Sequence, residues 1–382
     1  MPLFSQPAFV IITLGALVGI ASSLLGTFLV LRKNSMLSDA ISHSILLGIV
    51  LVFLITKNQF SPFYILGAAA TGVLTVVLTE LIVKSGRVKN DAAIGLVYPL
   101  LFAIAVVLIN LYARNVHIDT DAVLLGEIGF AWINTVTIAG VEVARPLLSM
   151  ATVTLVNLLF VLLFYKELKL ATFDAGLAAA LGFSPSLLFY ALLSLTSITA
   201  VTAFDAVGAV LLVAFVIVPP AAAYLLTDKL WRMLLYSALI ALASSLLGYS
   251  LAIALDVSIG GMMAVFTGVF LVLAFLFSPR YGLMAQELRR ARQFEENAAR
   301  VLLVHLYNHE NDVQSQLENA AIALRTHLRW TAVQVDTAVA YSLEQSLITK
   351  RPDSGLLELT AKGRILAQEV LEPWRQIVGH QG

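Results

Sequence analysis

The chain has 382 residues, of which 59% are hydrophobic and 13% are charged, with a formal net charge of zero. Soluble domains carry about 25% charged residues, so this composition excludes an ordinary soluble protein over most of the length and indicates an integral membrane protein. The sequence contains no cysteine, which excludes disulfides, thiolate metal sites and iron–sulfur clusters.

The charged residues are unevenly distributed along the chain. Residues 1–279 contain 12 acidic and 12 basic residues, and the much shorter remainder contains the other 12 of each. We therefore predict an all-α polytopic membrane domain over 1–280. An amphipathic linker helix over 281–314 and a small cytoplasmic α(+β) domain over 315–382 follow it.

Apolar runs long enough to cross a bilayer dominate the membrane domain, since a helix needs about 20 residues to do so. The first run ends at Arg32 and Lys33 rather than at a cleavage site, so we interpret it as a retained span. The count is nine, or eight if 206–227 is partly re-entrant, and Pro219-Pro220 predicts a helix break inside that run. The runs are 7–31, 36–56, 61–84, 91–113, 146–165, 186–204, 206–227, 233–255 and 259–278.

Basic residues fix the predicted orientation, because cytoplasmic loops carry an excess of Lys and Arg. One set of loops holds ten of them and the opposite set holds three. The ten-residue set is assigned to the cytoplasm, which places the N-terminus outside and the C-terminal domain inside. The ten are Arg32, Lys33, Lys84, Arg87, Lys89, Lys166, Lys169, Lys229, Arg232 and Arg280, and the three are Lys57, Arg114 and Arg145.

The second run contains a carboxylate, Asp39, and an imidazole, His43, four residues apart. On a helix this spacing puts both side chains on one face, with Cβ atoms roughly 5–6 Å apart. Oxygen and nitrogen donors suit a divalent transition metal, and ionisable groups in a span mark a pathway or a site. The pair predicts a metal site. Two other interpretations are a charge satisfied by the helix dipole for Asp39 and an interhelical hydrogen bond for His43.

Two loops are longer than a turn. The outer loop, 114–145, contains His117, Asp119 and Asp121, which form either a metal-collecting loop or a solvated turn. The sequence Gly-Glu-Ile-Gly-Phe-Ala-Trp that follows predicts a short surface helix.

The inner loop, 166–185, has an Ala-rich centre with high helix propensity from Phe173 to Leu181. Asp174 suits the N-cap of a short helix, and Gly182 suits the position after its end. The bilayer gives no reason for an exposed helix between two spans, so we interpret it as a docking element for a cytoplasmic partner.

Three segments follow one another along the chain and read LRKNSMLSDAISHSILLG at 31–48, KELKLATFDAGLAAALGFSP at 166–185 and AVGAVLLVAFVIVPPAAAYLLT at 206–227. In this order they resemble the permeases of bacterial ABC importers for manganese, zinc or iron. The similarity covers about residues 1–280, nearly the whole membrane domain.

This resemblance implies a type II importer permease in the bacterial plasma membrane that moves Mn²⁺, Zn²⁺ or Fe²⁺ inward and binds no cofactor permanently. The lack of a His-rich loop favours manganese. The implied partners are a cytoplasmic ABC ATPase dimer, a second permease subunit and an extracellular metal-binding protein. By the same resemblance Asp39 and His43 match the family's pore pair. The inner-loop helix matches its ATPase-coupling helix, with Phe173, Asp174, Ala178, Leu181 and Gly182 as the coupling residues.

The sequence contains no Gly-x-x-x-x-Gly-Lys-Ser/Thr phosphate loop. The chain is therefore predicted to be a transport subunit and not an enzyme, with ATP hydrolysis on a separate chain. Three alternatives are a secondary metal transporter, a permease for iron chelates or cobalamin, and a membrane-anchored regulator.

After the long helix, residues 315–382 read as two helices, a short hairpin around Pro352-Asp353-Ser354-Gly355 and a last helix. The segment from Leu357 to Arg364 resembles the wing and following helix of winged-helix proteins such as metal-responsive repressors, over about 315–375. The domain is electrically neutral, and its predicted recognition segment, 331–345, has no basic residue, so no nucleic acid is expected.

The long helix before this domain ends with His305 and His309, again four residues apart, followed by Glu310. The two open interpretations are a metal-sensing site and two histidines on a solvated helix face.

Overall fold

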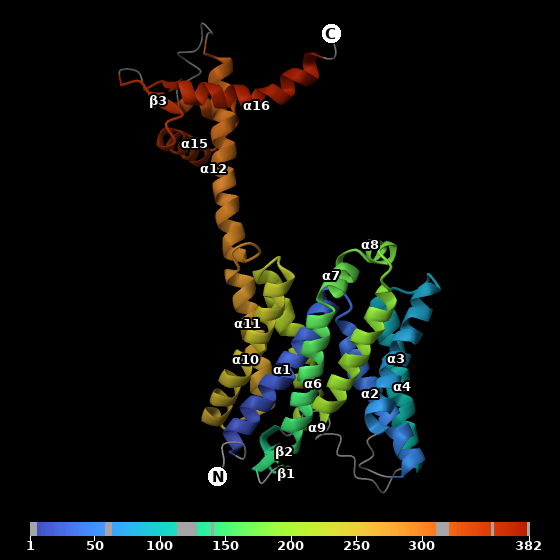
Figure 1. The fold of residues 1–382 in the computed structure, drawn as a ribbon. Coiled ribbons are helices and arrows are strands. Elements are labelled where there is room, and N and C mark those ends of the chain that lie inside the picture. Colours follow the sequence, from blue (N-terminus) through green and yellow to red (C-terminus); the bar gives the residue numbers. More distant parts are fainter. Residues whose placement is uncertain are drawn as a thin grey trace. The chain divides into compact units, whose positions relative to one another are not determined.

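The computed structural model describes residues 6–57, 63–112, 128–138, 141–310, 321–352 and 355–379 (Figure 1). His117, Asp119 and Asp121 of the outer loop, and Asp353-Ser354 of the predicted hairpin turn, lie outside these residues. The chain forms two compact units, Met1–Gly282 and Leu283–Gly382, which are described separately below.

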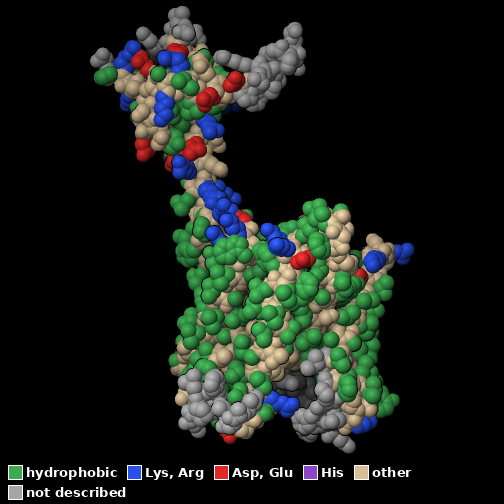
Figure 2. Space-filling model, in the orientation of Figure 1, with side chains coloured by type: hydrophobic (Ala, Val, Ile, Leu, Met, Phe, Trp, Pro, Cys, Tyr) green, Lys and Arg blue, Asp and Glu red, His purple; other side chains and the backbone are tan. Residues whose placement is uncertain are grey.

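The first unit is a bundle of long apolar helices. Nine segments of the described residues are long and apolar enough to cross a membrane, in agreement with the larger of the two predicted counts. Hydrophobic side chains cover most of the face of the bundle seen in Figure 2. The helices are α1 (Pro7–Leu31), α2 (Met36–Thr56), α3 (Phe63–Lys84), α4 (Asn90–Tyr112), α6 (Arg145–Leu163), α9 (Pro185–Leu226), α10 (Leu230–Leu255) and α11 (Ile259–Phe277).

Helix α9 supplies two of these spans, Pro185–Phe204 and Ala206–Leu226. A kink lies near the start of the second span, at Gly208, whose backbone is non-helical at φ 74° and ψ 171°, a region that glycine enters at little cost. The expected break at Pro219-Pro220 is wrong, because the helix continues past both prolines to Leu226.

A helix in a membrane tolerates proline where neighbouring protein covers the freed backbone. Pro220 has no N–H, so the carbonyl of Val216, four residues earlier, receives no helical hydrogen bond from it. This carbonyl lies directly against Gly26 of α1, where a Cβ atom would overlap it. The missing side chain of Gly26 therefore lets α1 press closely on α9 at the level of the prolines.

Helix α1 is the centre of the bundle and packs against α6, α9 and α10. Its small residues allow this, since Gly19 meets Ala241 of α10 and Gly15 meets Met263 of α11. Close backbone approach at small residues is the main way in which membrane helices associate.

Short elements occupy the two ends of the bundle (Figure 1). Helices α7 (Tyr165–Phe173) and α8 (Ala175–Ala180) lie at one end. At the other end are the 3₁₀ turn η2 (Ile128–Phe130) and the antiparallel strands β1 (Thr135–Ile138) and β2 (Val141–Ala144). The sequence predicts a short surface helix there. Within the described residues, this helix is present only as the 3₁₀ turn η2. This hairpin is a feature that the sequence analysis above does not predict, although β1 is β-branched at all four positions and β2 carries valine at alternate positions.

The second unit packs α12 (Leu283–Asn308) against α15 (Ala332–Glu344), α16 (Ala361–Gly379) and the hairpin of β3 (Ile348–Lys350) and β4 (Leu357–Leu359), while α14 (Ala321–His327) packs against α15. The predicted order of helices and hairpin is therefore present, and the winged-helix fold stays a prediction. The second half of α12 belongs to the core of this unit. Its core includes Ala298, Leu302, Leu303, Leu306, Leu324, Val335, Ala338 and Ala367.

The contact between α1 and α9 predicts a specific sensitivity to substitution. Gly26→Ala forces a Cβ atom against the backbone of Val216, which cannot move aside as a flexible side chain would. We expect a loss of stability of about 1–3 kcal/mol, seen as a lower thermal unfolding midpoint of the purified protein in detergent. The control is Gly268→Ala in α11, where nothing lies within 4 Å of the added atom. Equal midpoints for the two variants would contradict the packing described.

Candidate functional site

Helix α2 presents Asp39 and His43 on one face. Asp39 lies in the first turn of the helix, and its Oδ1 is 3.5 Å from Nε2 of His43. The two side chains are 37% and 30% exposed within the single chain. The i, i+4 arrangement expected from the sequence is present, and the pair is open to a further partner.

Two aromatic residues of α4 hold the ring of His43. Tyr98 stacks on it with ring centres 5.6 Å apart and an interplanar angle of 26°. Phe102 meets it edge-on at 6.1 Å and 84°. The sequence predicts neither contact, because both depend on how α2 and α4 pack.

No third ligand joins the pair within the part of the chain that the structure describes. No group of three His, Asp or Glu side chains among the described residues is placed to hold a metal ion. A single copy of the chain therefore presents one carboxylate and one imidazole at this site.

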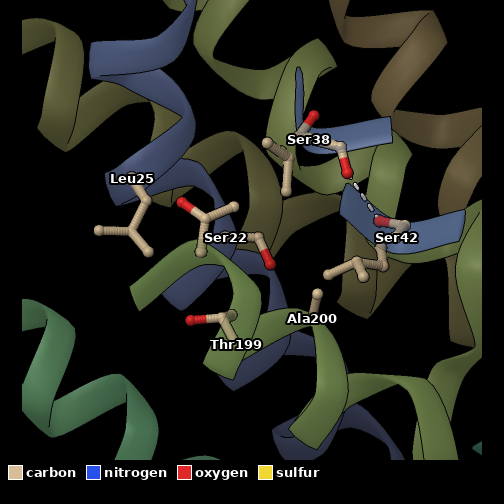
Figure 3. A pocket seen from close by; sticks show the side chains of 9 residues that line it. Ser22, Leu25, Ser38, Ser42, Thr199 and Ala200 are labelled. Carbon is tan, nitrogen blue, oxygen red and sulfur yellow. Dashed lines mark hydrogen bonds between the residues drawn. The ribbon is translucent and has the colours of Figure 1, made fainter. Parts of the chain in front are cut away.

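A neighbouring face of α2 meets a small cavity lined partly by hydroxyl groups (Figure 3). Ser38 and Ser42 reach it from α2, and the Ser42 Oγ donates a hydrogen bond of 2.8 Å to the backbone oxygen of Ser38. The space is about the size of one water molecule. Helices α1 and α9 complete the lining with Ser22, Leu25, Thr196, Thr199, Ala200, Leu212 and Val216, from both sides of the α9 kink.

The cavity is part of a buried polar layer. Asn157 of α6 donates a hydrogen bond of 2.8 Å to Thr199 Oγ1, and Thr199 bonds back to the carbonyl of Leu195. Such hydroxyls satisfy themselves on their own helix and add little bulk. The interior behind Asp39 and His43 is thus polar and closely packed.

The short helix α8 has the local structure predicted for it. The Asp174 carboxylate accepts a hydrogen bond of 2.8 Å from the N–H of Leu177, and Gly182 follows the helix end at φ 88°. Ala178 is buried against the unit. The other side of α8 and its flanks expose large apolar side chains, namely those of Phe173, Leu177, Leu181 and Phe183.

An arginine connects this end of the bundle to α1. The Arg32 guanidinium, just after α1, donates a hydrogen bond of 3.0 Å to the carbonyl of Ala171 and one of 3.4 Å to Thr172 Oγ1, both in α7. It also lies 5.0 Å from the ring centre of Phe189 in α9. Burial lowers the pKa of Arg32, and arginine remains charged in proteins. From the sequence, Arg32 indicates only the orientation of the spans.

The ABC 3 transport family matches residues 5–278 of this chain. The chain belongs to this family.

Two relatives are close in sequence. The zinc transport system membrane protein TroD of Treponema pallidum is 44% identical over 365 residues, which cover 95% of this chain and 98% of that protein. The manganese transport system membrane protein MntD of Bacillus subtilis is 48% identical over 289 residues, 75% of this chain and 98% of that protein. The alignment with TroD covers 95% of this chain, so it must include most of the second unit.

A solved structure shares the fold. The complex of PsaBC from Streptococcus pneumoniae with Fab contains a chain that matches with a TM-score of 0.60 at 27% identity, over 71% of this chain and 92% of that one. The bundle described above is thus an ABC permease fold.

The link through Arg32 leads to a prediction on local stability. Arg32→Gln removes a half-buried charge that is hydrogen-bonded to α7, and hydrogen bonds to charged groups contribute about 1.5–3 kcal/mol. We expect hydrogen–deuterium exchange over residues 165–178 to accelerate about tenfold or more, measured by mass spectrometry on the purified protein. The control is Lys33→Gln, because Lys33 is the exposed neighbouring cation. Unchanged exchange in the Arg32 variant would show that α7 is held by other contacts.

Proposed function

We propose that this chain is the membrane permease of an ATP-driven importer that moves a divalent transition metal into the cytoplasm. Family membership supports the permease role, and two relatives are named for zinc and manganese transport. The proposal that the substrate is a bare cation rests on the half-exposed Asp39–His43 pair on α2. Mn²⁺ and Zn²⁺ are the leading substrates, and Fe²⁺ suits the same donors.

The pair is suited to passing an ion on rather than to storing it. Metal ions that are held firmly have four or more ligands, and one chain offers two. A second permease subunit, with its own pair or an equivalent one, would complete the coordination across the pore. Weak coordination allows an ion both to enter and to leave, and the aromatic contacts of His43 keep the imidazole oriented while the ion passes.

The energy would come from a separate ABC ATPase dimer. Helix α8 would dock to it through its exposed apolar side chains. Movement of α8 and α7 would reach α1 through Arg32, then α9 through the contact at Gly26, and α2 through the hydroxyl-lined cavity that α9 shares with it. The kink at Gly208 is the point at which α9 can bend.

An extracellular metal-binding protein would deliver the ion at the end of the bundle that carries the β1–β2 hairpin. In this arrangement the protein lies in the bacterial plasma membrane, with α8 and the second unit on the cytoplasmic side and no nucleic acid bound. Family membership argues against a secondary transporter or a membrane-anchored regulator. An iron chelate or cobalamin arrives with its metal already coordinated, so its transport would not require Asp39 and His43 as ligands.

The proposed pathway predicts the effect of removing either ligand. In cells that express the complete transport system, Asp39→Asn and His43→Ala should each lower uptake of radioactive Mn²⁺ or Zn²⁺ about tenfold or more. Loss of even an outer partner of a metal ligand costs roughly 10–100-fold in affinity or activity.

The matched control is Asp91→Asn, which neutralises an exposed carboxylate in the first turn of α4, as Asp39 lies in the first turn of α2. Membrane levels of all variants are compared by immunoblot. Normal uptake by both ligand variants would refute the site.

The docking role of α8 predicts a second effect. Leu177→Asp and Leu181→Asp place charges on an apolar surface and should abolish co-purification of the ATPase with the permease, together with metal uptake. Ser85→Asp, in the exposed connection between α3 and α4, adds the same charge at the same end of the bundle and should leave co-purification intact. Retention of the ATPase by the α8 variants would show that the partner binds elsewhere.

A further inference from the structure

The second unit brings together three of the six histidines of the chain. His305 and His309 lie one turn apart at the end of α12, with ring centres 4.7 Å apart. His327, the last residue of α14, lies with its ring centre 6.0 Å from that of His305. The interpretation of a solvated helix face is wrong for His305, which is only 9% exposed.

The core of this unit fixes the backbone that carries the three histidines. The N–H of His309 donates a hydrogen bond of 3.2 Å to the carbonyl of His305, so the helical geometry of the pair is retained. Leu306 beside His305 and Leu324 in α14 are both buried in the core. Beyond His309, the Glu310 carboxylate accepts hydrogen bonds of 3.0 and 3.1 Å from Nε of Arg364, which connects this point to α16.

We infer that His305, His309 and His327 form a second binding site for a divalent transition metal, separate from Asp39 and His43. Histidines four residues apart on a helix face are a known zinc-binding pattern, and imidazole is a ligand for zinc and the neighbouring metals. With metal–nitrogen bonds of about 2.0–2.1 Å, two imidazoles on one tetrahedral ion have ring centres roughly 5 Å apart. The observed separations lie on either side of this value.

The site closes around the ion by rotation of side chains. As the described residues stand, no three of these donors surround a common point. His327 is exposed and His309 is half-buried, so both rings have room to turn, and such rotations are fast in accessible side chains. The bound ion would tie the end of α12 to α14. Helix α12 begins a few residues after the last span. Metal binding to this unit would therefore be transmitted to the transport domain through α12.

The test counts ions on the full-length protein, purified in detergent without a histidine tag. The parent carries Asp39→Asn and His43→Ala, so the result does not depend on the transport site. Equilibrium dialysis against Zn²⁺ should show one more ion per chain in this parent than in its His309→Gln/His327→Gln derivative. Titration with Co²⁺ should give visible ligand-field absorption that this derivative loses.

Two further variants make the result decisive. Asn308→Ala, at an exposed position between the two histidines of α12, should bind as the parent does. His305→Gln alone should weaken Zn²⁺ binding about tenfold or more, with size-exclusion chromatography as the check that the variant is folded. Equal stoichiometry and equal affinity in the parent and the double variant would overturn the inference and leave the three histidines as packing groups.

Discussion

The contact between Gly26 of α1 and the Val216 carbonyl of α9 is the constraint on which the membrane unit depends. A membrane leaves no water to satisfy backbone groups inside it, and Pro220 deprives this carbonyl of its helical donor. Covering it with the backbone of another helix requires a residue without a side chain. Once α1 is held there, Gly19 lets α10 approach closely at Ala241, and Gly15 leaves room for the Met263 side chain of α11. Helix α1 thus becomes the buried centre of the bundle.

This packing gives α2 two different faces. Its serines point to the small hydroxyl-lined space shared with α1 and α9, while Asp39 and His43 point to a region that remains partly open in the single chain. The inner face fixes the height and rotation of the helix. The outer face can then present two ligands without the protein closing around the ion, which is the geometry that a transient site needs.

The Arg32 contact connects the bundle to its docking end. Its charge lies under α7, where two hydrogen bonds and the ring of Phe189 replace the water it has lost. Such a half-buried, multiply bonded arginine holds a short helix more firmly than an exposed ion pair, which contributes little. Helix α8 can therefore expose apolar side chains and still keep a defined position.

The sequence by itself determined the spans, the Asp39–His43 spacing and the caps of α8, because each depends on residues close together in the chain and on the length of an apolar helix. Tertiary structure decided the rest. The kink fell at Gly208 rather than at the prolines, because Gly26 supplied the cover that the Val216 carbonyl needed. The aromatic contacts of His43, the bonds of Arg32 and the approach of His327 to His305 join residues on different helices. No local pattern encodes such contacts, since they exist only after the helices have packed.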